Sequence, residues 1–297
     1  MNQCIMYYNK STKQFIDLSA KDATASIAKE HGIMGFTRIN ICMENLGLNT
    51  SNNCFIALPD FTYTRNALRW NAGFPYGCII SIEQSMPFIP IDFRPNCCGI
   101  IFAEVPTQDF DIGKIKRNYF ELMHSYDDID SSDFNRRNHF FGLYHNETNN
   151  TYYFLIHGSF SLVKKNLYSE KNENLMSNAC SIDILGTPFH FLKDDVASLY
   201  YNQYLHFEKM SMKYRELILK GLFPNAKILF HRTHEGFMDM GTILLGAYAD
   251  ELPFVCPIML APEEDLPITN INKPVNISSA KAIYCAPHGG GYALSSV

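Results

Sequence analysis

The segment from Lys193 to Lys220 is the strongest structural signal in the chain, because its apolar residues recur at helical spacing. These residues are Val196, Leu199, Tyr200, Phe207, Met210, Tyr214 and Leu217. Gly221 follows the pattern and is predicted to end the helix. Most strand-like segments stand before this helix and do not alternate with helices, which favours an α+β fold over a doubly wound parallel sheet.

Short apolar runs bounded by turn residues predict the strands. They cover residues 54–58, 78–82, 99–103, 138–144, 151–157, 226–230, 242–248 and 282–284. We expect a β-rich start within residues 1–50, further helices at 22–31 (ended by Gly32) and 109–124, and a loop at 231–239. Neither an internal repeat nor a clear linker interrupts residues 1–297, so we expect a single compact domain with mixed sheets.

The composition bears on location and partners. With a net charge of −5, the chain lacks the overall positive charge that is typical of nucleic-acid-binding proteins. A local basic groove is compatible with this net charge. The nine cysteines form no Cys-x-x-Cys motif, and the sequence shows neither a signal peptide nor a long apolar run. These features favour a soluble protein of the reducing cytoplasm without a membrane partner, and leave the oligomeric state open.

Cysteine and histidine residues stand next to several predicted strands. They are Cys98, His139, His157 and His234. Thiolate and imidazole groups bind manganese, zinc or iron, and a thiolate can bridge two ions. Each residue alone is equally compatible with packing, as a small buried hydrophobe or a hydrogen-bonded core histidine. Together they are candidate metal ligands.

The stretch Cys285-Ala286-Pro287-His288 is followed by three glycines, Gly289 to Gly291. Backbone N–H groups bared by glycines can cradle a phosphate or an oxyanion, and the histidine beside them can act as a base, nucleophile or metal ligand. A flexible C-terminal tail is the simpler alternative. An esterase with this stretch as its oxyanion hole is disfavoured, because the chain has no Gly-x-Ser-x-Gly motif.

These motifs, in this order, resemble those of the RtcB-type RNA-splicing ligases, over residues from about 55 to 296. In the first half, Pro59-Asp60 with Gly73–Gly77, Pro90–Gly99, Asn138-His139-Phe140 and Leu155–Ser159 are similar to the family's Pro-Asp-x-His, Asp/Cys, Gly-Asn-His-Phe and His-Ser-Gly-Ser-Arg segments. In the second half, Tyr214-Arg215, His234, Leu244–Ala247 and Cys285–Gly291 are similar to its Asn-Arg, His-Asn, Arg-Lys-Gly-Ala and His-Gly-Ala-Gly-Arg segments.

The family joins an RNA 3′-phosphate or 2′,3′-cyclic phosphate to a 5′-hydroxyl in tRNA splicing and RNA repair, with GTP and manganese. The resemblance implies an RtcB-like domain with Mn²⁺ or another divalent transition metal, GTP as a second cofactor, and RNA as a partner. His288 would be the nucleophile of a GMP–histidine intermediate, and Asn138, His288, Gly289 and Gly290 would contact the nucleotide. Cys98, His139, His157 and His234 would be the metal ligands, with Cys98 bridging two ions.

The sequence departs from the family pattern at several positions where the family has charged residues. The Asp expected just before Cys98 is missing, and Asp92 is the nearest carboxylate. Gly142 stands where the family has a guanine-reading Glu, and Leu244 and Leu245 replace its Arg and Lys. Since Arg and Lys hold phosphates, two alternatives stand beside the ligase. One is a degenerate RtcB-like pseudoenzyme whose metal site serves binding or regulation, and the other is a metal-dependent phosphate-ester hydrolase.

Overall fold

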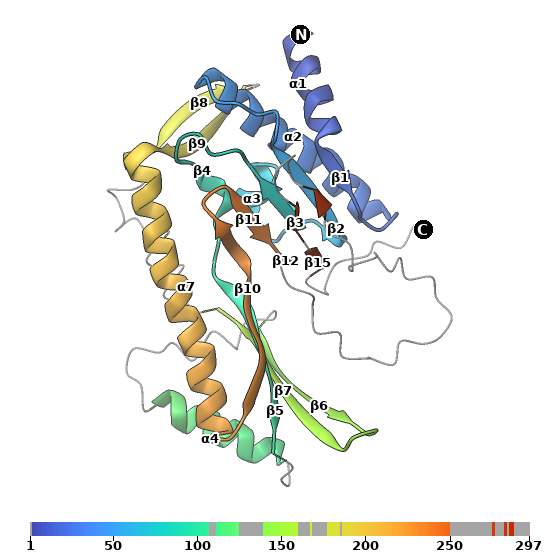
Figure 1. Cartoon of the computed structure of the whole chain (residues 1–297), viewed down its shortest axis with the longest axis vertical. Coiled ribbons are helices and arrows are strands. Elements are labelled where there is room, and N and C mark those ends of the chain that lie inside the picture. Colours follow the sequence, from blue (N-terminus) through green and yellow to red (C-terminus); the bar gives the residue numbers. More distant parts are fainter. Residues whose placement is uncertain are drawn as a thin grey trace. The chain divides into compact units, whose positions relative to one another are not determined.

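The computed structural model describes residues 2–106, 111–124, 139–159, 167, 177–184, 186–249, 275–276, 282–283 and 285–287 (Figure 1). Within these residues the helices are α1 (Asn2–Lys13), α2 (Ala23–Asn45), α3 (Ala67–Asn71), α4 (Ile112–His124) and α7 (Asp194–Leu222), with a 3₁₀ turn η1 at Ile91–Phe93. Among the described helices, none combines the length and the apolar character needed to cross a membrane.

The main sheet has eight strands and is mixed. Their spatial order is β1 (Phe15–Asp17), β2 (Cys54–Thr62), β3 (Tyr76–Ser81), β11 (Thr242–Leu245), β10 (Lys227–Asp239), β5 (Cys98–Val105), β7 (Thr151–Gly158) and β6 (Phe140–Asn146). β1 and β2 pair in parallel, whereas β2–β3, β3–β11, β10–β5, β5–β7 and β7–β6 pair antiparallel. The predicted α+β class is therefore confirmed.

The described residues also form smaller sheets. β4 (Phe88–Pro90), β9 (Thr187–Lys193) and β8 (Cys180–Ile184) form a three-stranded antiparallel sheet. β12 (Ala247–Ala249) pairs with β15 (Cys285–Pro287), and β13 (Val275–Asn276) pairs with β14 (Ala282–Ile283).

The chain divides into two compact units, each assembled from segments that are distant in the sequence. Unit 1 comprises Met1–Pro95, Asn174–Tyr201 and Phe237–Val297. One of its core clusters is formed by Cys54, Ile56, Leu58, Ile79, Leu244 and Ala247. Helices α1 and α2 lie beside each other in this unit (Figure 1).

Unit 2 comprises Asn96–Glu173 and Asn202–Gly236, and it carries the strands β5, β6 and β7 with most of β10. These strands pair antiparallel in the order β10-β5-β7-β6. Buried residues of the central strands and of α4 and α7 form its core, among them Ile101, Ala103, Phe154, Ile156, Tyr119, Met123, Ile218 and Leu219.

The N-terminal predictions were partly wrong. The start of the chain is the helix α1, and its β-structure is limited to the three residues of β1. Asp22 does cap α2, accepting a hydrogen bond from the Ala25 N–H at 2.7 Å. The helix does not end at Gly32, however, but continues to Asn45. A Cβ at Gly35 would stand 2.2 Å from the Gly73 carbonyl oxygen, so this glycine allows close backbone packing.

In the second half of the chain, the predicted loop was wrong, and the long helix ends slightly later than predicted. Residues 231–239 form no loop, because β10 runs unbroken from Lys227 to Asp239 and pairs with β5. The helix α7 is confirmed but passes Gly221 and ends at Leu222. Its predicted apolar residue Leu199 is 60% exposed. The predicted hairpin of β6 and β7 is confirmed.

Candidate metal centre

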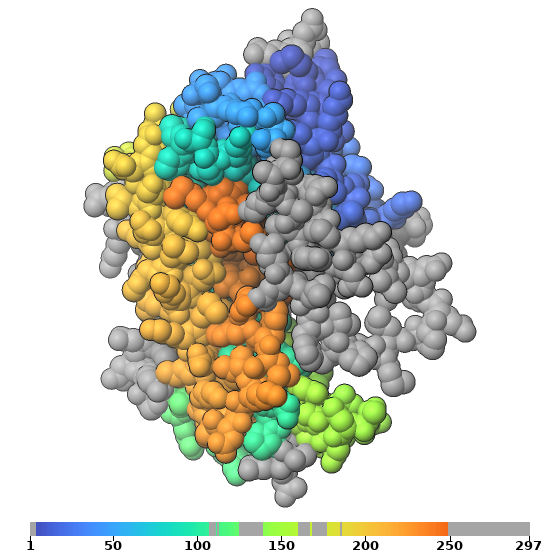
Figure 2. All heavy atoms as spheres, in the orientation of Figure 1, coloured from blue at the N-terminus to red at the C-terminus, as the bar shows by residue number. Residues whose placement is uncertain are grey.

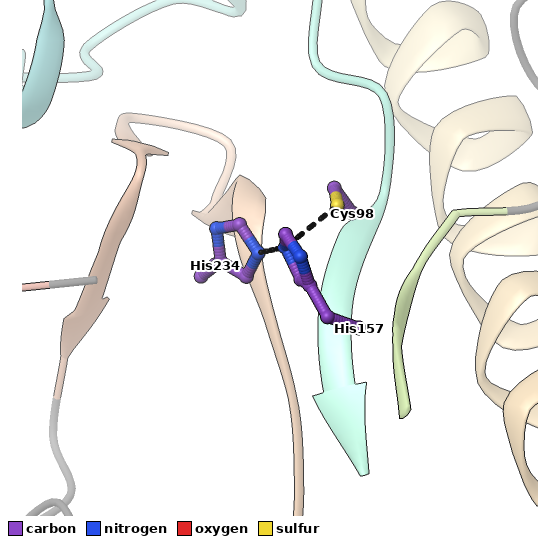
Figure 3. A group of neighbouring side chains, drawn as sticks. All are labelled: Cys98, His157 and His234. Carbon is purple, nitrogen blue, oxygen red and sulfur yellow. Dashed lines mark hydrogen bonds between the residues drawn. The ribbon is translucent and has the colours of Figure 1, made fainter. Parts of the chain in front are cut away.

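Three of the predicted metal ligands meet inside unit 2. The Cys98 Sγ atom and one ring nitrogen each of His157 and His234 all lie within 4.8 Å of one another. The His157 Nε2 atom is 3.3 Å from Cys98 Sγ and 3.0 Å from His234 Nε2. Figure 3 shows the His157 ring between the other two side chains. All three residues are buried, with exposed fractions of 5% or less.

The strand register explains why Cys98 and His157 meet. In antiparallel pairs, directly opposed residues share a face of the sheet, and alternate residues along a strand do so too. His157 opposes Ile100 in β5, and Cys98 lies two residues before Ile100. The two donor side chains therefore leave the sheet on the same face, at the end where β5 begins and β7 finishes.

A β-bulge supplies the third donor. Thr233 pairs with Gly99 and Glu235 pairs with Cys98, so His234 is an extra residue in β10 that has no register partner in β5. Such bulges change the direction of a side chain and are frequent beside functional sites. His234 lies two residues after Arg232, which opposes Ile100, so its imidazole leaves the sheet on the same face as Cys98 and His157.

The donor set fits a metal ion better than it fits hydrogen bonding alone. A ring nitrogen offers either one N–H or one lone pair, yet His157 Nε2 faces both a sulfur and another Nε2 atom. In a tetrahedral zinc site with bonds of about 2.0–2.1 Å to nitrogen and 2.3 Å to sulfur, neighbouring donors are about 3.3–3.6 Å apart. The observed separations of 3.0 and 3.3 Å are close to this spacing. Cys98, His157 and His234 could hold a metal ion.

His139 is in contact with the same sulfur. Its Nε2 atom is 3.4 Å from Cys98 Sγ, and its ring is nearly perpendicular to that of His157, with 5.6 Å between the ring centroids. His139 immediately precedes β6 and is buried. It does not belong to the three-residue donor group. Cys98 is thus in contact with a histidine outside that group as well as with one inside it, which is the arrangement a bridging thiolate requires.

The neighbouring Cys97 has a different environment. Its φ of 58° is the left-handed conformation, and its N–H donates to the Glu235 carbonyl at 3.0 Å. The Asn96 side chain accepts from the Cys98 N–H at 2.8 Å, which closes a tight turn. Burial raises the pKa of the Cys97 thiol well above its usual range, and Glu208 adds to this effect. Cys97 is therefore a neutral packing residue, whereas Cys98 faces the histidines.

The carboxylate considered as a substitute metal ligand has other neighbours. Asp92 lies in η1, in unit 1, and burial raises its pKa while the charges of His190, Arg94 and Arg38 oppose that shift. The donor group built on Cys98 does not include it. Its electrostatic partners are thus two arginines and a histidine of its own unit.

The other predicted site residues fall outside the part of the chain that the structure describes. These are Asn138, His288, Gly289 and Gly290. Just before His288, β15 ends at Pro287 and pairs with β12. The nucleotide-contacting roles of these four residues stay predictions.

Two residues behind the donor group were not predicted to serve it. Arg215 and Ser211 are completely buried on α7 and hydrogen-bond the backbone next to two of the ligands. The sequence signals for them were a serine and an arginine at i and i+4 within an apolar helical pattern, and the similarity of Tyr214-Arg215 to the Asn-Arg segment of the ligases, which assigned Arg215 no role. A polar pair in that position is typical of an exposed helix face, so the pattern alone could not identify their role.

Comparison of the sequence with protein-family models finds no match, and none of the curated protein sequences compared with it matches it either.

Proposed function

We propose that the protein is a metal-dependent enzyme of RNA-end joining, similar to the RtcB-type ligases, with its metal ion held by Cys98, His157 and His234. One observation carries the proposal. Cys98 and His157 are 59 residues apart in the chain, and His157 and His234 are 77 apart, yet their donor atoms converge. All three positions stand beside predicted strands and also match the ligase motifs, and an accidental match would not require them to meet.

The chemistry of the donors favours a borderline transition metal. One thiolate and two imidazoles suit zinc, iron or cobalt better than magnesium or calcium, which take oxygen ligands. On the resemblance to the ligases, we propose Mn²⁺ as the functional ion, with His139 serving a second ion that shares Cys98. A bound divalent ion would neutralise phosphate charge at this face of the sheet and orient a phosphate ester for in-line displacement.

We propose His288 as the nucleophile of the covalent step. We propose that its neutral imidazole attacks the α-phosphate of GTP, forms a P–N bond and releases pyrophosphate. The N–H groups of Gly289 and Gly290 would then face the phosphate oxygens, together with the Asn138 side chain. The RNA 3′-end would accept GMP from the histidine and become activated for attack by a 5′-hydroxyl.

One observation favours a second candidate, a metal-binding module without nucleotide chemistry. Leu244 and Leu245 stand where the ligases carry Arg and Lys, and both are buried in β11. Leu244 belongs to the apolar core of unit 1 and pairs with Ile79 of β3. These positions thus contribute packing here, and they bring no positive charge to a phosphate.

Incubation with manganese and GTP radiolabelled at its α-phosphate separates the two candidates. The ligase proposal predicts covalent label on the wild-type chain, none on His288→Ala, and strongly reduced label on Cys98→Ala. Cys97→Ala is the matched control and should be labelled like the wild type. Metal binding without any covalent label would reject the ligase in favour of the module, and absence of metal binding would reject both.

A further inference from the structure

One face of α7 in unit 2 carries a row of polar residues where an apolar stripe is expected. Tyr204, Glu208, Ser211 and Arg215 follow one another at intervals of three or four residues, which places them on one side of the helix. Tyr204, Ser211 and Arg215 are completely buried. Arginine is rarely buried unless its donors are used, so their contacts indicate what this face does.

Arg215 binds the backbone beside two metal-ligand positions. Its Nη1 group donates to the Gly158 carbonyl at 2.8 Å and to the Cys97 carbonyl at 3.1 Å. Gly158 follows His157 directly, and Cys97 precedes Cys98 directly. A single guanidinium nitrogen therefore joins the peptide groups next to two of the three donors.

Ser211 hydrogen-bonds the same Cys97 carbonyl. Its hydroxyl donates to the Cys97 carbonyl at 3.0 Å and accepts from Arg215 Nη1 at 3.0 Å. The Cys97 carbonyl thus accepts from both side chains. Since Cys97 adopts a left-handed conformation that a cysteine disfavours, these bonds also stabilise the turn that directs Cys98.

The same helix face reaches the strand of the third donor. The Arg215 Nε–H donates to His231 Nε2 at 3.4 Å, and Glu208, which accepts a hydrogen bond from the Tyr204 hydroxyl at 3.1 Å, lies next to the Thr233 side chain. Thr233 directly precedes His234. In the space-filling view the atoms of α7, in yellow to light orange, lie against those of β10, in orange (Figure 2).

We propose that Arg215, supported by Ser211, is a positioning residue for the metal centre, holding the backbones of β5 and β7 so that Cys98 and His157 keep their donor spacing. This inference rests on the metal site proposed above. The planar guanidinium of arginine can donate to two carbonyls in a fixed geometry, which the single ammonium of lysine cannot reproduce. Residues that orient metal ligands from behind commonly change metal affinity by about 10–100-fold.

The test is the affinity for Co²⁺ added to the purified metal-free chain, followed by the thiolate-to-cobalt charge-transfer absorption and the ligand-field bands. Arg215→Met should weaken Co²⁺ binding about 10–100-fold and shift the ligand-field bands. Arg215→Lys should restore part of the affinity, and Ser211→Ala should lose about threefold or more. Lys213→Met is the matched control, because Lys213 is exposed on the same helix, and it should bind like the wild type.

The outcomes separate this inference from the proposed function. If the wild-type chain gives no thiolate-to-cobalt band, the metal site itself is rejected. If the wild type binds and the Arg215 and Ser211 variants bind equally well with the same spectrum, the positioning role is overturned. If Arg215→Met does not fold, as judged by circular dichroism, Ser211→Ala and Arg215→Lys decide, and affinities equal to the wild type in both would overturn the role.

Discussion

The Cys98 Sγ atom lies 3.3 Å from His157 Nε2 because Cys98 begins β5, His157 lies near the end of the neighbouring antiparallel strand β7, and both side chains leave the same face of the sheet. The bulge at His234 in the adjoining strand adds a third donor to the same face. A sheet end with one thiol and two imidazoles in contact is expensive to bury unless the groups are satisfied. A metal ion satisfies all three at once.

The two adjacent cysteines provide a direct contrast. We expect Cys98→Ala to abolish tight metal binding, because it removes the only sulfur donor of the group. Cys97→Ala should leave the metal affinity within a few-fold of the wild type, because its thiol is neutral and faces the Tyr204–Glu208 side of the turn. Titration of the metal-free variants with Co²⁺ or Mn²⁺ measures both. Equal losses in the two variants would contradict the assignment of Cys98 alone as the ligand.

The histidine variants should differ in the number of metal ions that they retain. His157→Ala and His234→Ala remove members of the donor group and should lose the tightest-bound ion. His139→Ala should retain that ion and lose only a second, weaker one, because His139 contacts Cys98 from outside the group. Metal content by mass spectrometry after equilibrium dialysis gives the counts. A His139 variant that loses all metal would show that the two sites are one.

His231 should make the stability of unit 2 sensitive to acid. Burial and the charges of Arg215 and Arg232 lower the pKa of His231 to about 3. A histidine with a lowered pKa in the folded state contributes stability that is fully present above the unfolded pKa of about 6.5 and is lost as the pH falls toward 3.

Urea unfolding of the metal-free chain between about pH 7 and pH 4 measures this dependence. The free energy of unfolding should fall with the pH in the wild type, by at most about 1.4 kcal/mol per pH unit from this group. His231→Gln should show a shallower fall. An unchanged slope in the variant would mean that His231 does not carry the effect.

Two glycines of α2 should respond differently to alanine. In Gly35→Ala the new Cβ would stand 2.2 Å from the Gly73 carbonyl oxygen, and backbone must move to admit it. We expect a loss of about 1–3 kcal/mol in the free energy of unfolding. In Gly32→Ala the nearest atoms are the ring ends of Phe55 and Phe61 at 3.2 and 3.3 Å.

Those aromatic rings can shift slightly, and alanine gains about 1 kcal/mol in helix propensity over glycine. Gly32→Ala should therefore cost little or stabilise the chain. Thermal unfolding of the two variants beside the wild type provides the comparison. A larger loss for Gly32→Ala than for Gly35→Ala would contradict the packing described for α2.

Local patterns in the sequence predicted much of the fold. The apolar runs of β2, β3, β5 and β7 and the turn between β6 and β7 depend on nearby residues, so they could be read directly. Gly32 misled the prediction of α2, because it lies inside the helix beside the rings of Phe55 and Phe61, which belong to another segment, and does not end it.

The candidate metal centre was predictable in its residue types and not in its geometry. A cysteine and histidines at strand ends indicated ligands, and the convergence of Cys98, His157 and His234 follows from register. The bulge at His234 depends on how β10 meets β5, and residues 231–239 in isolation resemble a loop. The role of Arg215 depends on the carbonyls of Cys97 and Gly158, which no sequence pattern places beside a helix.

X-ray absorption spectroscopy of the protein loaded with one equivalent of Zn²⁺ or Co²⁺ tests the central claim most directly, because it reports the donor atoms themselves. The account predicts one sulfur at about 2.3 Å and at least two imidazole nitrogens at about 2.0–2.1 Å. The sulfur contribution should vanish in Cys98→Ala and persist in Cys97→Ala. A first shell of oxygen and nitrogen only, in the wild-type protein, would contradict the assignment of Cys98, His157 and His234 as a metal centre.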